Sequence, residues 1–289
     1  MNKHAYLIMA HQHTSVLRQL LRQLDDVRND IYLHMDLKCS EDGSAYFDEV
    51  QQAQLFLVPR LNVRWGAYSQ IDCEVNLLKI ATRKKYLYYH LLSGDSLTLK
   101  NQDQIHQFFN EHTGQEFIQF QAKEPTELTL KRIRYFYPAT PFNKTKLVRG
   151  VKAVGIKLQN LVGIDRLANI DFIPQKGGTW FSITDRLARY LIEKEPWFAR
   201  RFRHTYAPDE FFVQTIVENS EFKSAVFDQA YSDSCQSCLR YIKWTDDCFG
   251  PVLLTMTDLN EIRQSGCLFA RKFGSQDSVL LEQINRLTS

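Results

Sequence analysis

Long apolar runs are missing from this sequence, and so are the usual marks of export. No stretch of the 289 residues approaches the roughly 20 apolar residues of a transmembrane helix. The first apolar run, residues 5–10, is too short for the core of a signal peptide, and no small-residue cleavage site follows it. We therefore expect a cytoplasmic protein, either soluble or peripheral on the inner face of the membrane.

Cysteine is scarce and poorly spaced for binding a metal. Of the six cysteines, only Cys235 and Cys238 form a C-x-x-C pair, whereas a structural zinc site usually has two such pairs. Cys248 can supply a third ligand, but no fourth is near it in the sequence. We expect free thiols in a reducing compartment, with a zinc site as the alternative.

A strong excess of charge is also absent, as are two nucleotide-binding motifs. The net charge of +3 is too small to indicate a nucleic-acid-binding protein. No G-x-G-x-x-G follows the first apolar run, and no G-x-x-x-x-G-K-[ST] occurs anywhere. These absences argue against a dinucleotide site and against a P-loop NTPase.

The sequence does contain an alternation of strand-like and helix-like segments. Strands are expected at 5–10, 30–36, 54–58, 62–65 and 86–96, and helices at 14–24 and 69–83. This alternation predicts an α/β fold whose mostly parallel central sheet is flanked by helices. Ligands bind beyond the carboxyl ends of strands in such sheets, and His11, Asp36 and Asp95 follow three of the expected strands.

One segment, YAPDEFFVQTIVENS (206–220), combines a helix signature with an unexpected charge. Pro208, Asp209 and Glu210 are expected to form the first turn of a helix, and Glu210 then lies on or beside the apolar face. The helix dipole favours acids in a first turn, so this position has a purely structural explanation. Taken alone, these residues leave open whether Glu210 has a further role.

A second segment, NKTKLVRGVKAVGIK (143–157), mixes basic and apolar residues. The cations are Lys144, Lys146, Arg149, Lys152 and Lys157. A basic amphipathic stretch can lie on an anionic membrane, which makes peripheral membrane contact one hypothesis. A solvated surface helix or a loop packed on the domain is the alternative.

Six stretches in order resemble a known family. They are IYLHMDLK (31–38), VRWGAYS (63–69), YLYYHLLSGDSLTLKNQDQIHQFF (86–109), KGGTWFSITDRLARYLIE (176–193), APDEFFVQTIVEN (207–219) and DLNEIRQSGCLFARKF (258–273). Together they are similar to the core-2/I-branching β-1,6-N-acetylglucosaminyltransferases and the related peptide O-xylosyltransferases, family 14 of the glycosyltransferases. The resemblance covers nearly the whole chain and is weakest over 120–175.

The resemblance implies a GT-A-like nucleotide-sugar fold in one glycosyltransferase domain over 1–289. The nucleotide-binding part is expected at about 1–120 and the acceptor and catalytic part at about 121–289. The implied reaction is an inverting transfer from a UDP-sugar, best guess N-acetylglucosamine in β-1,6 linkage, to a glycan or lipid-linked glycan. The family lacks the D-x-D metal motif, and no D-x-D occurs here, so we expect no metal and no other cofactor. The absence of disulfides and of an anchor suggests a bacterial-type member.

The resemblance also implies roles for particular residues. Glu210 is expected to be the general base that takes the proton from the acceptor hydroxyl. Arg271 and Lys272 are expected to stabilise the leaving diphosphate, as a bidentate fork and a point charge. The softer assignments are His11, Asp36 and Trp65 to the nucleotide, and Asp95, Trp180 and Trp244 to the sugars. Turn capping or core packing is the alternative for most of them.

This sequence departs from the family pattern at one place. The N-acetylglucosaminyltransferases carry a further phosphate-binding arginine, and Phe249 or Gly250 falls at its position here. The Arg271–Lys272 pair can substitute for it, as in the xylosyltransferases. A xylosyl- or other hexosyltransferase on the same scaffold, or a non-catalytic glycan- or nucleotide-binding module, is the alternative function.

Overall fold

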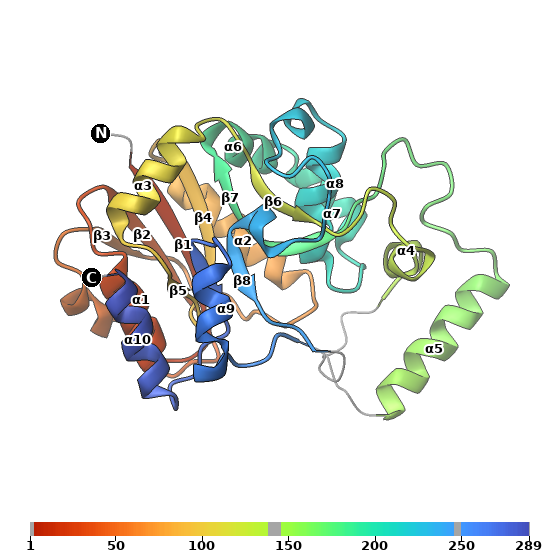
Figure 1. Cartoon of the computed structure of the whole chain (residues 1–289). Coiled ribbons are helices and arrows are strands. Elements are labelled where there is room, and N and C mark those ends of the chain that lie inside the picture. The colour runs from red at the N-terminus through yellow and green to blue at the C-terminus, as the bar shows by residue number, and fades with distance from the viewer. Residues whose placement is uncertain (1–2, 138–145, 246–249, 289) are drawn as a thin grey trace.

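A central sheet of six strands organises the protein. The structure is a computed structural model that describes residues 3–137, 146–245 and 250–288 (Figure 1). The strand order is β3 (Gln54–Leu57), β2 (Asn29–Met35), β1 (His4–Ala10), β4 (Tyr88–Ser93), β7 (Gly177–Thr184) and β6 (Phe117–Phe120). The first four of these strands are mutually parallel, whereas β7 is antiparallel to both of its neighbours.

Helices cover both faces of this sheet and enclose two apolar cores. One core includes α1 (Ser15–Gln23), α3 (Gln102–Glu111), α9 (Leu259–Gln264) and α10 (Ser278–Thr288). The other includes α2 (Ser69–Ala81), α6 (Asp185–Glu193), α7 (Glu195–Phe202) and α8 (Phe212–Glu218). Strand β1 contributes Tyr6 and Ile8 to the first core and Ala5 and Leu7 to the second. Because alternate side chains of a strand point to opposite faces, a strand that is covered on both faces needs a continuous apolar run. The sheet with helices on both faces confirms the predicted α/β class.

The chain reverses its direction of travel across the sheet between β1 and β4. It runs outward from β1 through β2 to β3 and then returns to place β4 on the other side of β1. In α/β sheets this switch point opens a crevice at the carboxyl ends of the two strands. A Cβ on Gly94 would lie 2.8 Å from the Ala10 Cβ, so a glycine is needed for the two strand ends to approach this closely.

A second, three-stranded sheet brings the C-terminal part of the chain to the same edge. It consists of β5 (Leu97–Thr98), β9 (Phe269–Arg271) and β8 (Arg240–Ile242). Since β5 follows β4 after a short turn, its pairing with β9 carries Arg271 to the carboxyl end of β4.

The remaining elements are peripheral helices and short 3₁₀ turns. Helices α4 (Glu127–Arg134) and α5 (Lys146–Leu161) lie to one side of the sheet, with α5 outermost (Figure 1). The 3₁₀ turns are η1 (Ser44–Glu49), η2 (Pro208–Glu210), η3 (Glu221–Ala225), η4 (Cys235–Cys238) and η5 (Met256–Asp258). Among the described residues, no helix is both long and apolar enough to span a bilayer.

Two predictions of local structure are wrong. Residues 62–65 form a loop and not a strand, because side chains satisfy the backbone here: the amides of Leu61 and Val63 donate to His34 Nε2 and Asp36 Oδ2 at 2.9 and 3.2 Å. Residues 208–210 form the separate turn η2, and α8 begins only at Phe212. The non-helical φ of −123° at Phe211 separates the two elements.

Candidate active site

The turn η2 presents Glu210 at the carboxyl edge of the sheet. It is preceded by Ala207, whose left-handed φ of 45° is uncommon for a residue other than glycine. Backbone strain of this kind clusters at functional sites. The Ala207 amide donates to the Gly66 carbonyl at 2.9 Å, and this bond helps to hold the strained residue in place.

Two cations contact the Glu210 side chain on the same oxygen. Oε2 lies 2.8 Å from Arg132 Nη1 and 3.3 Å from Lys176 Nζ. No hydrogen bond to Oε1 occurs among the described residues, and the side chain is 29% exposed. The carboxylate is therefore held through one oxygen, while the other remains available to a ligand hydroxyl.

Asp209, next to Glu210, is buried and faces the protein interior. Its Oδ2 accepts hydrogen bonds from Gln70 Nε2 at 3.1 Å and from Thr179 Oγ1 at 2.9 Å. Burial, together with the negative charge of Glu210, raises the pKa of Asp209 to about 6. These contacts fix the turn that carries Glu210.

A second buried acid, Glu74 on α2, lies behind this turn. Burial and then the charge of Asp209 raise the pKa of Glu74 well above its usual range, which favours the neutral acid. Neither of its carboxyl oxygens has a hydrogen-bond partner among the described residues. Sequence reasoning gave Glu74 no role, although its position among Ile71, Val75 and Leu78 on α2 was a signal that it would be buried.

Arg271 forms the centre of a second cluster, together with residues of the β4 turn. Its Nε donates to Ser93 Oγ at 2.9 Å, and its Nη2 lies 3.2 Å from Asp95 Oδ1. The guanidinium carbon lies 4.8 Å from the centroid of the Trp180 ring, within the range of a cation–π contact. Three predicted site residues, Arg271, Asp95 and Trp180, are thus in direct contact.

Lys272 follows Arg271 and is half-buried. No ion pair of its side chain occurs within the described part of the chain. Arg271, in contrast, is already paired with Asp95, so an incoming anion must share it or displace the carboxylate.

The amino end of β7 contacts both clusters. Lys176 pairs with Glu210, Thr179 donates to Asp209, and Trp180 packs on Arg271. Four residues along a strand cover about 13 Å, so the acid turn and the Arg271 cluster belong to one region of the surface. A Cβ on Gly177 would lie 1.7 Å from the Gln119 carbonyl oxygen, so only glycine allows β7 to begin this close to β6.

The residues predicted to bind the nucleotide lie near the carboxyl ends of β1 and β2. The Asp36 amide donates to the carbonyl of Ala10, the residue before His11, at 2.8 Å. Asp36 is buried, and its oxygens accept from Lys38 N, Lys38 Nζ and Val63 N at 2.8, 2.9 and 3.2 Å, which is the turn-capping alternative. His11 is exposed just beyond β1. Trp65 and Trp244 are 53% and 61% exposed, so the core-packing alternative is wrong for Trp65 and Trp244. Phe249 lies outside the described residues.

The described cysteines form no disulfide. Cys235 and Cys267 lie closest, with their sulfurs 3.7 Å apart. No group of three or more metal-ligating side chains occurs in 3–137, 146–245 and 250–288. Cys248, considered as a third zinc ligand, lies outside the described residues.

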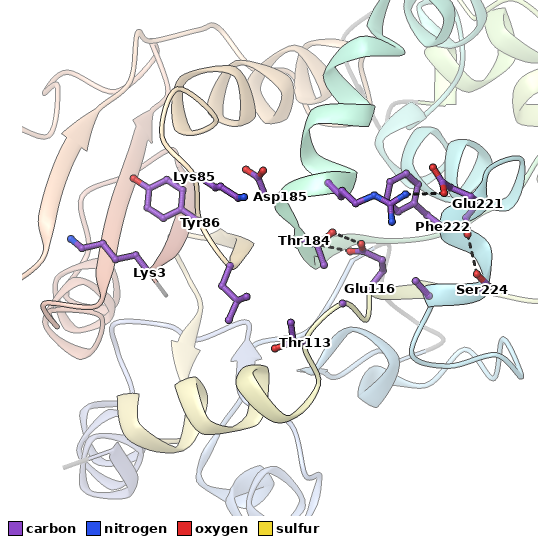
Figure 2. A pocket seen from close by; sticks show the side chains of 14 residues that line it. Lys3, Lys85, Tyr86, Thr113, Glu116, Thr184, Asp185, Glu221, Phe222 and Ser224 are labelled. Carbon is purple, nitrogen blue, oxygen red and sulfur yellow. Dashed lines mark hydrogen bonds and ion pairs between the residues drawn. The ribbon is translucent and has the colours of Figure 1, made fainter. Parts of the chain in front are cut away.

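A pocket of about 820 Å³ lies at the opposite, amino edge of the sheet (Figure 2). Its lining includes Lys85 before β4 and Thr184 at the end of β7, and Thr184 pairs with the first residue of β4. Buried Glu116 accepts from the Thr184 amide at 2.9 Å, and Arg186 pairs with Glu221 at 2.8 Å. None of the predicted site residues lines this pocket.

These features define a class of protein. A mostly parallel α/β sheet carries clustered acids and cations at its carboxyl edge, beside the switch point between β1 and β4. Nucleotide ligands bind at this place in open α/β folds. The chain is therefore an α/β protein with a polar ligand site of this type.

Comparison with known proteins identifies the family. The model of the Core-2/I-Branching enzyme family matches residues 4–263, and the chain belongs to this family. The match ends before Arg271 and Lys272, so it does not bear on that pair.

Two mouse proteins show similarity to the chain. The chain is 22% identical over 310 residues to the mouse protein named beta-1,3-galactosyl-O-glycosyl-glycoprotein beta-1,6-N-acetylglucosaminyltransferase 4, an alignment that covers 96% of this chain and 64% of the relative. The crystal structure of mouse xyloside xylosyltransferase 1 in its apo form aligns over 95% of this chain and 99% of its own, with 10% identity and a TM-score of 0.38. A likeness of that size carries no argument about mechanism.

Proposed function

We propose that this chain is an inverting glycosyltransferase that moves a sugar from a UDP-sugar to a glycan or lipid-linked glycan. The leading donor is UDP-N-acetylglucosamine, with transfer in β-1,6 linkage. One observation carries the proposal: the start of β7 contacts both an acid with a free oxygen, Glu210, and a cation, Arg271. An in-line displacement needs both, a base for the attacking hydroxyl and a counter-charge for the leaving group.

Glu210 is the proposed general base. Its Oε1 accepts the proton of the acceptor hydroxyl as that oxygen attacks the anomeric carbon of the donor. Arg132 and Lys176 hold Oε2 and fix the direction in which Oε1 points. Asp209 accepts hydrogen bonds from Thr179 and Gln70, and these bonds hold the turn in place.

Arg271 and Lys272 are the proposed partners of the diphosphate. Fixed cations stabilise the negative charge that grows on the leaving group in the transition state. When a phosphate takes Arg271, Asp95 loses its ion-pair partner and keeps the hydrogen bond from Ser93, so Oδ2 becomes available to hydroxyls of the donor sugar. No D-x-D motif occurs, so the proposal includes no metal.

A donor screen in the presence of EDTA tests this proposal. We expect UDP release from UDP-N-acetylglucosamine when a glycan acceptor is present, undiminished by the chelator. Loss of activity in EDTA that manganese restores would contradict the metal-free mechanism. A preference for UDP-xylose or a UDP-hexose would support the alternative transferases, and no release from any UDP-sugar would support a binding module.

A further inference from the structure

Helix α5 carries an apolar stripe that the rest of the protein leaves uncovered. The stripe consists of Val151, Val154, Leu158, Leu161 and, one residue beyond the helix, Val162, which are between 56% and 82% exposed. Spacings of three and four residues place these side chains on one side of the helix. A contiguous exposed apolar surface of this kind marks an interaction site.

A neighbouring side of α5 contacts the protein. The Gln159 side chain is hydrogen-bonded to the Phe136 backbone, accepting from its N–H at 2.7 Å and donating to its carbonyl at 3.0 Å. Lys152, two turns earlier, lies with its Nζ 5.0 Å from the centroid of the Tyr206 ring. Because these contacts orient the helix, the apolar stripe points away from the body of the protein, on the outermost element in Figure 1.

The charge of α5 indicates what covers the stripe. Its 16 residues contain no aspartate or glutamate, and its charged residues are Lys146, Arg149, Lys152 and Lys157. Lys152 faces the protein, whereas Lys157 is exposed. A second copy packed through α5 would bring together two helices that are each cationic and without an acid, which is unfavourable. An anionic phospholipid bilayer matches this helix, because it has negatively charged headgroups and an apolar layer directly beneath them.

We propose that the α5 stripe docks on an anionic phospholipid membrane, with its valines and leucines at the boundary between headgroups and acyl chains. The consequence for acceptor choice rests on the proposed function, whereas the docking does not. Tyr206, which Lys152 contacts, precedes the Ala207–Glu210 turn by one residue. A membrane under α5 therefore brings lipid-borne glycans to the side of Glu210, which favours a lipid-linked acceptor over a soluble one.

Vesicle flotation with matched variants tests the docking. The variant is Val151→Glu/Val154→Glu, and the control is Val27→Glu/Val279→Glu, two valines of similar exposure (50% and 56%) elsewhere on the surface. We expect wild type and control to float with vesicles of phosphatidylglycerol and phosphatidylcholine in equal parts. The α5 variant should bind these vesicles about tenfold more weakly or worse, since two charges enter the apolar stripe. Binding to phosphatidylcholine alone should be weak, and salt should reduce binding to the mixed vesicles.

Several results would overturn the docking. They are no flotation of the wild type, equal flotation of both variants, or binding that is indifferent to phosphatidylglycerol. Self-association of the wild type that is lost only in the α5 variant would instead make this face a dimer interface. UDP release with a soluble acceptor should be the same in all three proteins, because the substituted valines touch no proposed site residue. A protein that binds vesicles but releases no UDP would thus contradict the proposed function and leave the docking intact.

Discussion

The two edges of the central sheet differ in what they offer a ligand. The amino edge has the open pocket of about 820 Å³, yet its buried acid, Glu116, is satisfied by Thr184. The carboxyl edge brings together Glu210, Arg271 and Asp95 from segments far apart in the sequence. The chain takes a strained backbone at Ala207 to form that edge, and no comparable feature lines the pocket.

The difference shows why volume alone is a poor guide to function. The ion pair at the pocket, Arg186–Glu221, is exposed on both sides, whereas the ion pairs of Glu210 and Arg271 at the carboxyl edge are largely buried and need a specific fold to form. We therefore assign the chemistry to the carboxyl edge, and the following predictions test this comparison between the two edges.

The largest effect is expected from Glu210→Gln. Loss of a general base lowers the rate by roughly 10²–10⁴-fold, while UDP affinity should stay near normal. The matched control is Glu221→Gln, an acid at the rim of the amino-edge pocket that also pairs with an arginine. Initial rates of UDP release measure both. A near-normal kcat for Glu210→Gln, or a comparable loss of rate in Glu221→Gln, would contradict the assignment of the chemistry to the carboxyl edge.

Next in size is the effect of removing the two cations. Arg271→Ala/Lys272→Ala should weaken UDP binding by about a hundredfold or more, since each charge-assisted hydrogen bond contributes roughly 1.5–3 kcal/mol. Binding of uridine, which lacks phosphate, should hardly change. Calorimetric titration of both ligands measures the two effects.

The control for this pair uses the same residue types at the other edge. Lys85→Ala/Arg186→Ala removes one lysine and one arginine from the amino-edge pocket and should leave UDP affinity unchanged. Asp95→Asn is added to the double variant, because Arg271→Ala leaves the Asp95 carboxylate without its ion-pair partner. The triple variant therefore separates a loss of UDP binding from a loss of stability. Equal losses for UDP and uridine would show that the cations support the fold only.

The smallest effect concerns the pH dependence of stability at Asp209. Its pKa of about 6 in the folded protein exceeds the ordinary value of 3.8, so folding favours the protonated acid. The resulting stability is full below pH 3.8 and is lost as the pH rises through about 6. Relative to Asp209→Asn, wild type should lose on the order of 1–3 kcal/mol of unfolding free energy over this interval.

Urea unfolding at several pH values measures this difference. The exposed Asp48→Asn serves as the control and should run parallel to wild type, because its environment is solvent. The difference in unfolding free energy between wild type and Asp209→Asn could instead be independent of pH, or grow in favour of wild type as the pH rises. Either result would show that Asp209 is not a buried acid with a raised pKa.

The sequence was sufficient to predict the four parallel strands of the central sheet but not β6 or β7. Strand β1 is a continuous apolar run over residues 5–10, and β2 has an apolar centre at 31–33. Helix α1 has a matching cap at Thr14, which accepts a hydrogen bond from the Leu17 amide at 3.0 Å. The carboxyl ends of the strands meet as a parallel sheet requires, so the edge that carries Asp36 and Asp95 was predictable.

Pairings between distant residues could not be predicted in this way. The loop at 62–65 depends on side chains of β2, and the turn at Pro208–Glu210 depends on Ala207, whose conformation no local pattern specifies. The ion pairs of Glu210 with Arg132 and of Arg271 with Asp95 link residues 78 and 176 positions apart. Only the folded chain decides such contacts.

A crystal structure with UDP bound tests the central claim most directly. We expect the diphosphate oxygens within hydrogen-bonding distance of the Arg271 guanidinium and of Lys272 Nζ, at the carboxyl edge, with Asp95 released from its ion pair. UDP bound instead in the amino-edge pocket, against Lys85 and Arg186, would contradict the account.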